Sequence, residues 1–234
     1  FAVAVTAAVG MLLERLTIRP MVGEPLFSVA IVTIGLDIVV RTFTNDLIGQ
    51  VSKPMGDPFG AQTVDLGLVT VAHAEIATVI FTLIVLVLVA WFFRSRMGIA
   101  MRAVAFDQEA AMAQGIGVGR IFAIAWAIGA ALAAFGGLFA SLFPRSNGVT
   151  TTTAFLAFRA FPAVIVGGLD SISGAVVGGF IIGLAEAFAG TYLFGEAWSF
   201  LGVGFNGVVP WLVMLIVLFV RPYGLFGTEE IRRV

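Results

Sequence analysis

Cysteine is absent from this 234-residue sequence, and one histidine (His73) and one lysine (Lys53) are present. Without cysteine the chain can form no disulfide, hold no thiolate-ligated cluster and perform no thiol chemistry. Ser52 stands before Lys53, where a phosphate-binding loop would need glycine, so ATP cannot bind in that way. The sequence also lacks the H-E-x-x-H and G-x-S-x-G patterns of metalloproteases and hydrolases. We therefore predict no catalytic residue, no metal site and no cofactor.

Charged residues are also scarce. They make up 12% of the chain, whereas a soluble domain usually carries about 25%. Hydrophobic residues make up 60%, and the mean hydropathy is +1.07. Neither a water-soluble globule nor a disordered chain has this composition. A net charge of −1 and a pI of about 5.8 also argue against nucleic-acid binding, which calls for a basic surface.

Long uninterrupted apolar runs are what the sequence does contain, and they indicate an all-α, polytopic transmembrane helical bundle. Roughly 20 apolar residues cross a bilayer, so this chain could cross about seven times at most. A transmembrane barrel would show alternating segments of about ten residues instead. Residues 1–13 already lie within an apolar run that begins without methionine, so we interpret 1–234 as a single transmembrane domain that lacks its natural N-terminus. The expected apolar segments are 1–13, 26–43, 76–93, 121–143, 155–190 and 201–220.

Positive charges predict the orientation, because cytoplasmic loops are rich in Lys and Arg. If the crossings alternate, one face of the membrane holds only Lys53 and Arg145. The other face, which we assign to the cytoplasm, holds nine arginines: Arg15, Arg19, Arg94, Arg96, Arg102, Arg120, Arg221, Arg232 and Arg233.

The same count predicts that residues 154–190 form a helical hairpin instead of one helix. One continuous helix would place Arg221 outside, whereas a hairpin that enters and returns on the outer side keeps it inside. Gly167 and Gly168 are expected to break the helix, with a turn near 170–174 between arms of about 14 and 19 residues. In transporters, broken helices of this kind often mark the substrate route.

Small residues recur at every fourth position in two of the apolar segments. Such ladders allow helix backbones to approach closely in lipid, and packing is the simplest interpretation of both. Together they predict a tight bundle that could include a partner subunit. The ladders are Gly129, Ala133, Gly137 and Ser141, and Ala175, Gly179, Gly183 and Ala187, with Gly174 and Gly178 beside the second.

A short helix is predicted within residues 105–116, between two membrane segments. Asp107 is a suitable N-cap, Glu109 falls in the first turn where the helix dipole favours an acid, and Gly115 is a suitable stop. A helix of about two turns is marginal alone, so something must hold it. Its acidic residues do not suit an anionic lipid surface, so we favour docking into a cytoplasmic protein over the alternative of lying on the membrane.

Four charged residues fall inside the apolar segments: Asp37, Arg41, Arg159 and Glu186. Such residues are candidates for function by default. Asp37 and Arg41 are four apart, so a local ion pair is the simpler interpretation of those two. If the hairpin is symmetric about 172–173, Arg159 and Glu186 lie at equal depth. We therefore predict that these two side chains form an ion pair, directly or through one bridging water, that closes the hairpin like a latch.

Four stretches, taken together in this order, resemble the permease subunit of bacterial ABC importers for branched-chain amino acids, the LivH type. They are E-R-L-T-I-R-P at 14–20 followed by T-I-G-L at 33–36, the segment 98–116, the segment 161–186 with G-G-L-D-S-I-S-G-A at 167–175, and R-P-Y-G-L-F-G at 221–227.

The resemblance implies the multi-helix importer fold and further hydrophobic segments before residue 1. It also implies that the helix at 107–115 is the coupling helix that seats in an ATPase, with Arg102, Asp107, Glu109, Ala110, Ala111 and Gly115 as the coupling residues. Asp37, Arg41, Arg159, Gly167, Gly168 and Glu186 are then the candidates for the pathway or the latch.

The implied partners are two ABC ATPase subunits, a related second permease, a periplasmic binding protein and membrane lipid, and the implied place is the bacterial inner membrane. Related permeases of this pattern serve urea and short amides, and that alternative stays open. Three other function classes fit less well. A purely structural membrane subunit would need no broken helix, an intramembrane enzyme would need clustered acids, bases or metal ligands, and a channel would need no isolated cytoplasmic helix.

Overall fold

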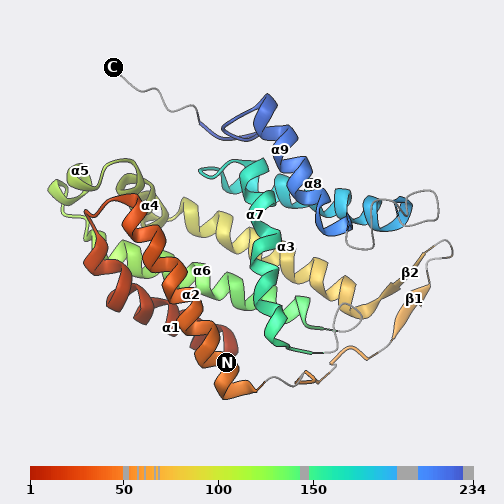
Figure 1. The fold of residues 1–234 in the computed structure, drawn as a ribbon. Helices are drawn as coiled ribbons and strands as arrows, with labels where there is room; N and C mark the ends of the chain where they lie inside the picture. Colours follow the sequence, from red (N-terminus) through yellow and green to blue (C-terminus); the bar gives the residue numbers. More distant parts are fainter. Residues whose placement is uncertain are drawn as a thin grey trace. The chain divides into compact units, whose positions relative to one another are not determined.

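Two compact units make up the computed structural model of this chain, residues 1–153 and 154–234, and each is described by itself. The structure describes residues 1–49, 53–56, 58–60, 62–65, 67, 69–142, 148–193 and 205–228 (Figure 1). Arg145, Arg232 and Arg233, three of the charges used to predict the orientation, lie outside the described residues.

Unit 1 is built from helices that follow the apolar runs of the sequence. They are α1 (Ala2–Leu13), continued by a π-helix (Glu14–Ile18) and a 3-10 turn (Arg19–Met21), then α2 (Leu26–Ile48), α3 (His73–Arg94), α4 (Arg96–Phe106), α5 (Gln108–Ala113) and α6 (Val118–Ala140). Helices α2, α3 and α6 are each long and apolar enough to cross a membrane. In unit 2, α8 (Ile172–Tyr192) is the fourth such helix among the described residues, which agrees with the predicted polytopic helical bundle.

Helices α1 and α6 pack along one another through small residues. A Cβ atom placed on Gly10 would lie 2.6 Å from the Cβ of Ala130 and 2.9 Å from the carbonyl oxygen of Trp126. At the other end of the contact, the guanidinium of Arg19 lies against Gly119, so the helices are antiparallel. The predicted ladder on α6 is not this contact face, because a Cβ on its members Gly129 or Gly137 would meet no atom within 4 Å.

Two loops that the charge count places on the outer side meet in unit 1. Lys53 and Val149 form an isolated antiparallel bridge, with N–H to O distances of 3.0 Å in both directions. Between α2 and α3 the chain also forms a small antiparallel hairpin, β1 (Thr63–Asp65) and β2 (Thr70–Ala72), which the all-α prediction did not include (Figure 1). The bridge agrees with alternating crossings, because residues after α2 and after α6 come to the same side.

In unit 2 the predicted helical hairpin is confirmed. Helices α7 (Leu156–Gly167) and α8 are separated by the turn 168–171 and pack against one another. Gly168 has a φ of +110°, a conformation that favours glycine, and the Ser171 side chain caps α8 by accepting from the Gly174 N–H at 3.0 Å. The arms have 12 and 21 residues instead of the expected 14 and 19. A short α9 (Val209–Val220) follows and confirms a helix within the predicted segment 201–220. Residues 201–204 of that segment lie outside the described residues.

The two arms of the hairpin meet through glycines next to the turn. A Cβ on Gly167 would lie 2.1 Å from the Gly174 carbonyl oxygen, and one on Gly178 would lie 2.0 Å from the Ala163 carbonyl oxygen. The second ladder of the sequence therefore does not form the contact, because Gly179 and Gly183 have no atom within 4 Å of an added Cβ. The residues that we had placed only beside the ladder, Gly174 and Gly178, are the ones that pack.

After α9, the chain folds back over the end of α7 and the hairpin turn. We call residues 221–228 the C-terminal strap. The N–H groups of Leu225 and Phe226 donate to the carbonyls of Val166 and Gly167 at 2.9 and 3.0 Å, so they satisfy groups that a helix end leaves open. Thr228 donates its N–H to Asp170 at 3.0 Å, and its hydroxyl also contacts that carboxylate.

The strap corrects the expected depth of the hairpin. We had expected two short arms that enter and return on the outer side. The turn instead meets the chain immediately after Arg221, the residue that marks the predicted cytoplasmic end of α9. The turn therefore lies at the same end of unit 2 as Arg221, and α8, unlike the 12-residue α7, is long enough to cross a membrane.

Candidate functional site

Three consecutive helices of unit 1, α4, α5 and the start of α6, form the candidate site, which we call the elbow. It begins where α3 ends: Ser95 has an extended backbone, and its side chain caps α4 by accepting from the Gly98 N–H at 3.3 Å. Gly98 is needed there, because an added Cβ would lie 2.4 Å from the Phe93 Cα. The chain therefore turns sharply out of a membrane-length helix and into the elbow.

Both ends of α5 are fixed by local hydrogen bonds, as the sequence predicts. Asp107 breaks the helix with φ −154° and ψ 110°, and its Oδ1 accepts from the Ala110 N–H at 2.9 Å. At the other end Gly115 has a φ of +79°, its N–H donates to the Met112 carbonyl, and the Ile116 N–H donates to the Ala111 carbonyl. This 6→1 and 5→2 pair is the Schellman arrangement, so the predicted cap and stop are confirmed.

An apolar cluster holds the elbow in place. Val104 of α4, Ala111 of α5 and Val118 and Ile121 of α6 are buried together. This cluster supplies the support that a six-residue helix cannot supply alone. From Asp107 to Gly115 every residue except Ala111 is exposed, so most of this helix is open to a partner. Ala111 is only 4% exposed, so arginine there would disturb the cluster.

Four of the six coupling candidates line an open hollow between α4 and α5. The hollow measures about 470 Å³, and Arg102, Asp107, Ala110 and Ala111 contribute to its lining. Phe106 also lines it, although its side chain is almost fully exposed. Glu109 is exposed in the first turn of α5 and is not among the lining residues. The elbow thus offers a partner an exposed aromatic side chain, charges of both signs and a concave face.

The four intramembrane charges separate into two cases. Asp37 and Arg41 form the expected ion pair along α2, with side chains that are 52% and 25% exposed. Arg159 and Glu186, both among the described residues, form no direct ion pair, so that form of the predicted latch is wrong. Arg159 is exposed on α7 and Glu186 is half-buried on α8.

The hairpin register explains the missing latch. The closest backbone approaches pair Gly167 with Gly174 and Ala163 with Gly178, which centres the hairpin between 170 and 171. The predicted centre was 172–173. With the observed pairing, Arg159 lies opposite the neighbourhood of Ile182, about one helical turn away from Glu186.

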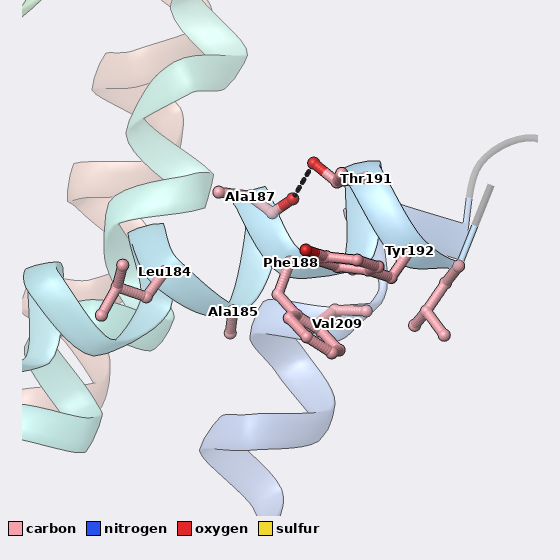
Figure 2. A pocket seen from close by; sticks show the side chains of 9 residues that line it. Leu184, Ala185, Ala187, Phe188, Thr191, Tyr192 and Val209 are labelled. Carbon is pink, nitrogen blue, oxygen red and sulfur yellow. Dashed lines mark hydrogen bonds between the residues drawn. The ribbon is translucent and has the colours of Figure 1, made fainter. Parts of the chain in front are cut away.

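A second hollow lies at the end of α8 that is remote from the strap, and measures about 640 Å³ (Figure 2). The tilted rings of Phe188 and Tyr192 contact one another there with centroids 4.7 Å apart, and Val209 of α9 faces them. The Thr191 hydroxyl donates to the Ala187 carbonyl at 2.9 Å, so it is already engaged. No charged side chain is among the described residues that line this hollow, so it offers no partner for an ion.

Three features escaped the sequence analysis. Helix α4 was not predicted, although its alanine, methionine and arginine residues favour helix and Ser95 marks its start. The C-terminal strap carries R-P-Y-G-L-F-G, which we used only for the resemblance. Glu14 is 1% exposed, and its Oε1 has no hydrogen-bond partner in the described part of the chain. Its position beside Arg15, where the apolar run ends, gave no signal of this.

Comparison with known proteins places these features in one family. The family model described as "Branched-chain amino acid transport system / permease component" matches residues 1–218. The high-affinity branched-chain amino acid transport system permease protein LivH of Escherichia coli K12 is 32% identical over 240 residues, which cover 100% of this chain and 74% of LivH.

Two further relatives carry similar names. BraD of Pseudomonas aeruginosa, a permease of the same description, is 32% identical over 99% of this chain and 74% of its own length. The probable LivH of Methanocaldococcus jannaschii is 26% identical over 96% of this chain and 72% of its own. No solved structure matches the chain.

Proposed function

This chain belongs to the permease component family of branched-chain amino acid transport systems, and from that membership we propose that it carries branched-chain amino acids through a membrane as one permease subunit of an ABC importer. It is a multi-pass membrane protein, and the family and the relatives are transport permeases, not enzymes. The names of LivH and BraD support leucine, isoleucine and valine as the substrate class.

The elbow is the observation that carries the coupling part of this proposal. Helix α5 is held by the Asp107 cap, by the Gly115 stop and by a buried cluster that it shares with α4 and α6. A displacement of α5 by a bound partner would therefore also move α4 and α6. The exposed Phe106 side chain could insert into a partner, and the hollow beside it could receive a side chain of that partner. We propose that this partner is an ATPase subunit, with Arg102, Glu109 and Ala110 at its edge and Ala111 as internal support.

The proposed assembly contains two ATPase subunits, a related second permease and a soluble periplasmic binding protein. The bacterial inner membrane is the proposed location, with the elbow and the strap in the cytoplasm. The arginine-rich ends of the helices support this orientation, because positive charge is retained on the cytoplasmic side.

Reconstitution of the complete complex in proteoliposomes tests the proposal. ATP hydrolysis and uptake are measured with binding protein and leucine, with urea, and with neither. We expect leucine to stimulate both activities and urea to stimulate neither. Stimulation by urea alone would move the chain to the urea and amide branch, and ATP hydrolysis without uptake of either compound would contradict a transport role.

A further inference from the structure

The middle of α2 carries charge at a depth where lipid cannot accommodate it. Helix α2 spans residues 26–48, so Asp37 stands at its midpoint, and Arg41 is about 6 Å further along. No residue from 27 to 48 is buried in the structure, although this helix is apolar and long enough to cross a membrane. Acyl chains solvate neither charge, so this part of α2 faces protein or water in the assembled transporter.

Polar side chains gather on one face of α2. At 100° per residue, Thr33, Asp37, Arg41, Thr44 and Asn45 fall within about 120° of one another. We call this set the polar face. Val39, at the same depth as Asp37, points to the opposite side of the helix and is 64% exposed.

Several of these polar groups are engaged within the helix, and Asp37 also keeps an accessible carboxylate. The hydroxyls of Thr33 and Thr44 donate to the carbonyls of Ala30 and Val40, so they need no outside partner. Asp37 and Arg41 neutralise one another, yet 52% of the Asp37 side chain stays accessible. A carboxylate has room for several hydrogen bonds, so Asp37 keeps an accessible acceptor for a third group.

We infer that the polar face of α2 lines the translocation route, and that Asp37 and Arg41 bind the amino acid in transit through its two charges. Asp37 takes the substrate α-ammonium and Arg41 takes the α-carboxylate. The zwitterion and the Asp37–Arg41 pair are complementary, since each carries one positive and one negative charge a few ångströms apart. This inference rests on the proposed function, because it takes an amino acid as the substrate.

The ion pair between Asp37 and Arg41 also suits a translocation route, where the affinity for the substrate must stay low enough for release. With no amino acid present, the two side chains satisfy one another and leave no unpaired charge in the membrane. When a zwitterion enters, it exchanges one ion pair for two. When it leaves, the pair closes again, so binding stays weak enough for release. A packing contact with another subunit would use the same charges differently, because it would cover them permanently.

Thiol accessibility distinguishes a polar face that lines the route from one that another subunit covers. The chain has no native cysteine, so any labelling of it comes from the cysteine that is introduced. Single cysteines are introduced at Ala30 and Thr33 on the polar face and at Val39 on the opposite face. The complete complex in proteoliposomes is treated with a membrane-impermeant, charged thiol reagent, and labelling of this chain is followed. We expect labelling at 30 and 33 that leucine with binding protein slows, and none at 39.

Substitution of the pair gives the second readout. We expect Asp37→Asn or Arg41→Gln to lower leucine uptake about tenfold or more, the factor typical of losing one charge-assisted hydrogen bond. The double variant Asp37→Leu/Arg41→Met removes both charges and suits lipid or protein packing well. We expect it to assemble and hydrolyse ATP but to import no leucine.

Two results would overturn the inference. One is a polar face that resists the reagent in a complex that imports leucine, since protein then covers it. The other is normal uptake by the apolar double variant, since the pair is then only structural. Failure of the unaltered complex to import leucine is a different result, because it refutes the proposed function itself.

Discussion

Two neighbouring glycines of α8 allow a sharp test of how the hairpin is held together. Gly178 and Gly179 are in the same helix and differ by one position, yet they face different surroundings. A Cβ on Gly178 would lie 2.0 Å from the Ala163 carbonyl oxygen and 2.8 Å from the Gly167 nitrogen, whereas one on Gly179 would meet nothing within 4 Å. We predict that Gly178→Ala destabilises unit 2 and that Gly179→Ala does not.

The magnitude follows from the geometry. A carbon and a carbonyl oxygen approach no closer than about 3.3 Å, so the new methyl group overlaps by roughly 1.3 Å with backbone that cannot rotate away. Overpacking of this kind costs about 1–3 kcal/mol. Alanine gains nearly 1 kcal/mol over glycine in a helix, but that gain is common to both variants and cancels in their difference. The pair should therefore differ in free energy of unfolding by about 1–3 kcal/mol.

Thermal unfolding of the purified protein in detergent, followed by tryptophan fluorescence, measures this difference. For a chain of this size, each kcal/mol shifts Tm by about 2–4 °C, so the two variants should unfold roughly 2–12 °C apart. Adding Ala163→Gly to Gly178→Ala should not restore stability, because the obstacle is the carbonyl of residue 163 and not its methyl group. Equal Tm values for the two glycine variants, or rescue by glycine at 163, would refute the packing argument.

Three further predictions concern the elbow and the strap. Ala111→Arg should cost about 3 kcal/mol of stability, because it places an unpaired charge in the buried cluster, whereas Ala110→Arg should keep the Tm and lose only leucine-stimulated ATP hydrolysis; equal Tm values would contradict the burial argument. Asp107→Ala should cost about 1 kcal/mol and reduce coupling, while Asp107→Asn should preserve both, since Asn also caps helices; hydrogen exchange of α5 amides reports the difference. Thr228→Val should lower the Tm by removing a hydroxyl bond to Asp170 worth about 1.5 kcal/mol, while Thr228→Ser should retain it, and identical Tm values would show that the bond contributes nothing.

The parts of this fold that the sequence predicted correctly depend on residues close together in the chain. Asp107 caps α5 through the third residue after it, and Gly115 stops the helix within one turn. Gly168 ends α7 and begins the hairpin turn because its own φ is positive. The family could also be identified from the sequence, because the resemblance depends on whole stretches of residues and not on single tertiary contacts.

The parts that could not be predicted depend on residues far apart in the chain. The four-residue ladder on α8 was a sound pattern, but the contact with α7 uses Gly174 and Gly178, one position away on the helix surface. Both sets are small and equally spaced, so the sequence of α8 alone cannot choose between them. Ala111 shows the same limit, because its burial depends on Val104, Val118 and Ile121 and not on its own helix.

Arg159 and Glu186 show how small an error in register removes a predicted interaction. Equal depth was derived from a hairpin centred at 172–173, whereas the glycine contacts centre it about two residues earlier. A shift of two in the centre moves the partner of any residue by four, which is one full helical turn, or about 6 Å along the axis. An ion pair needs its charged atoms within about 4 Å, so it does not survive such a shift. Asp37 and Arg41 were predicted correctly because one helix fixes their separation, and no packing register enters.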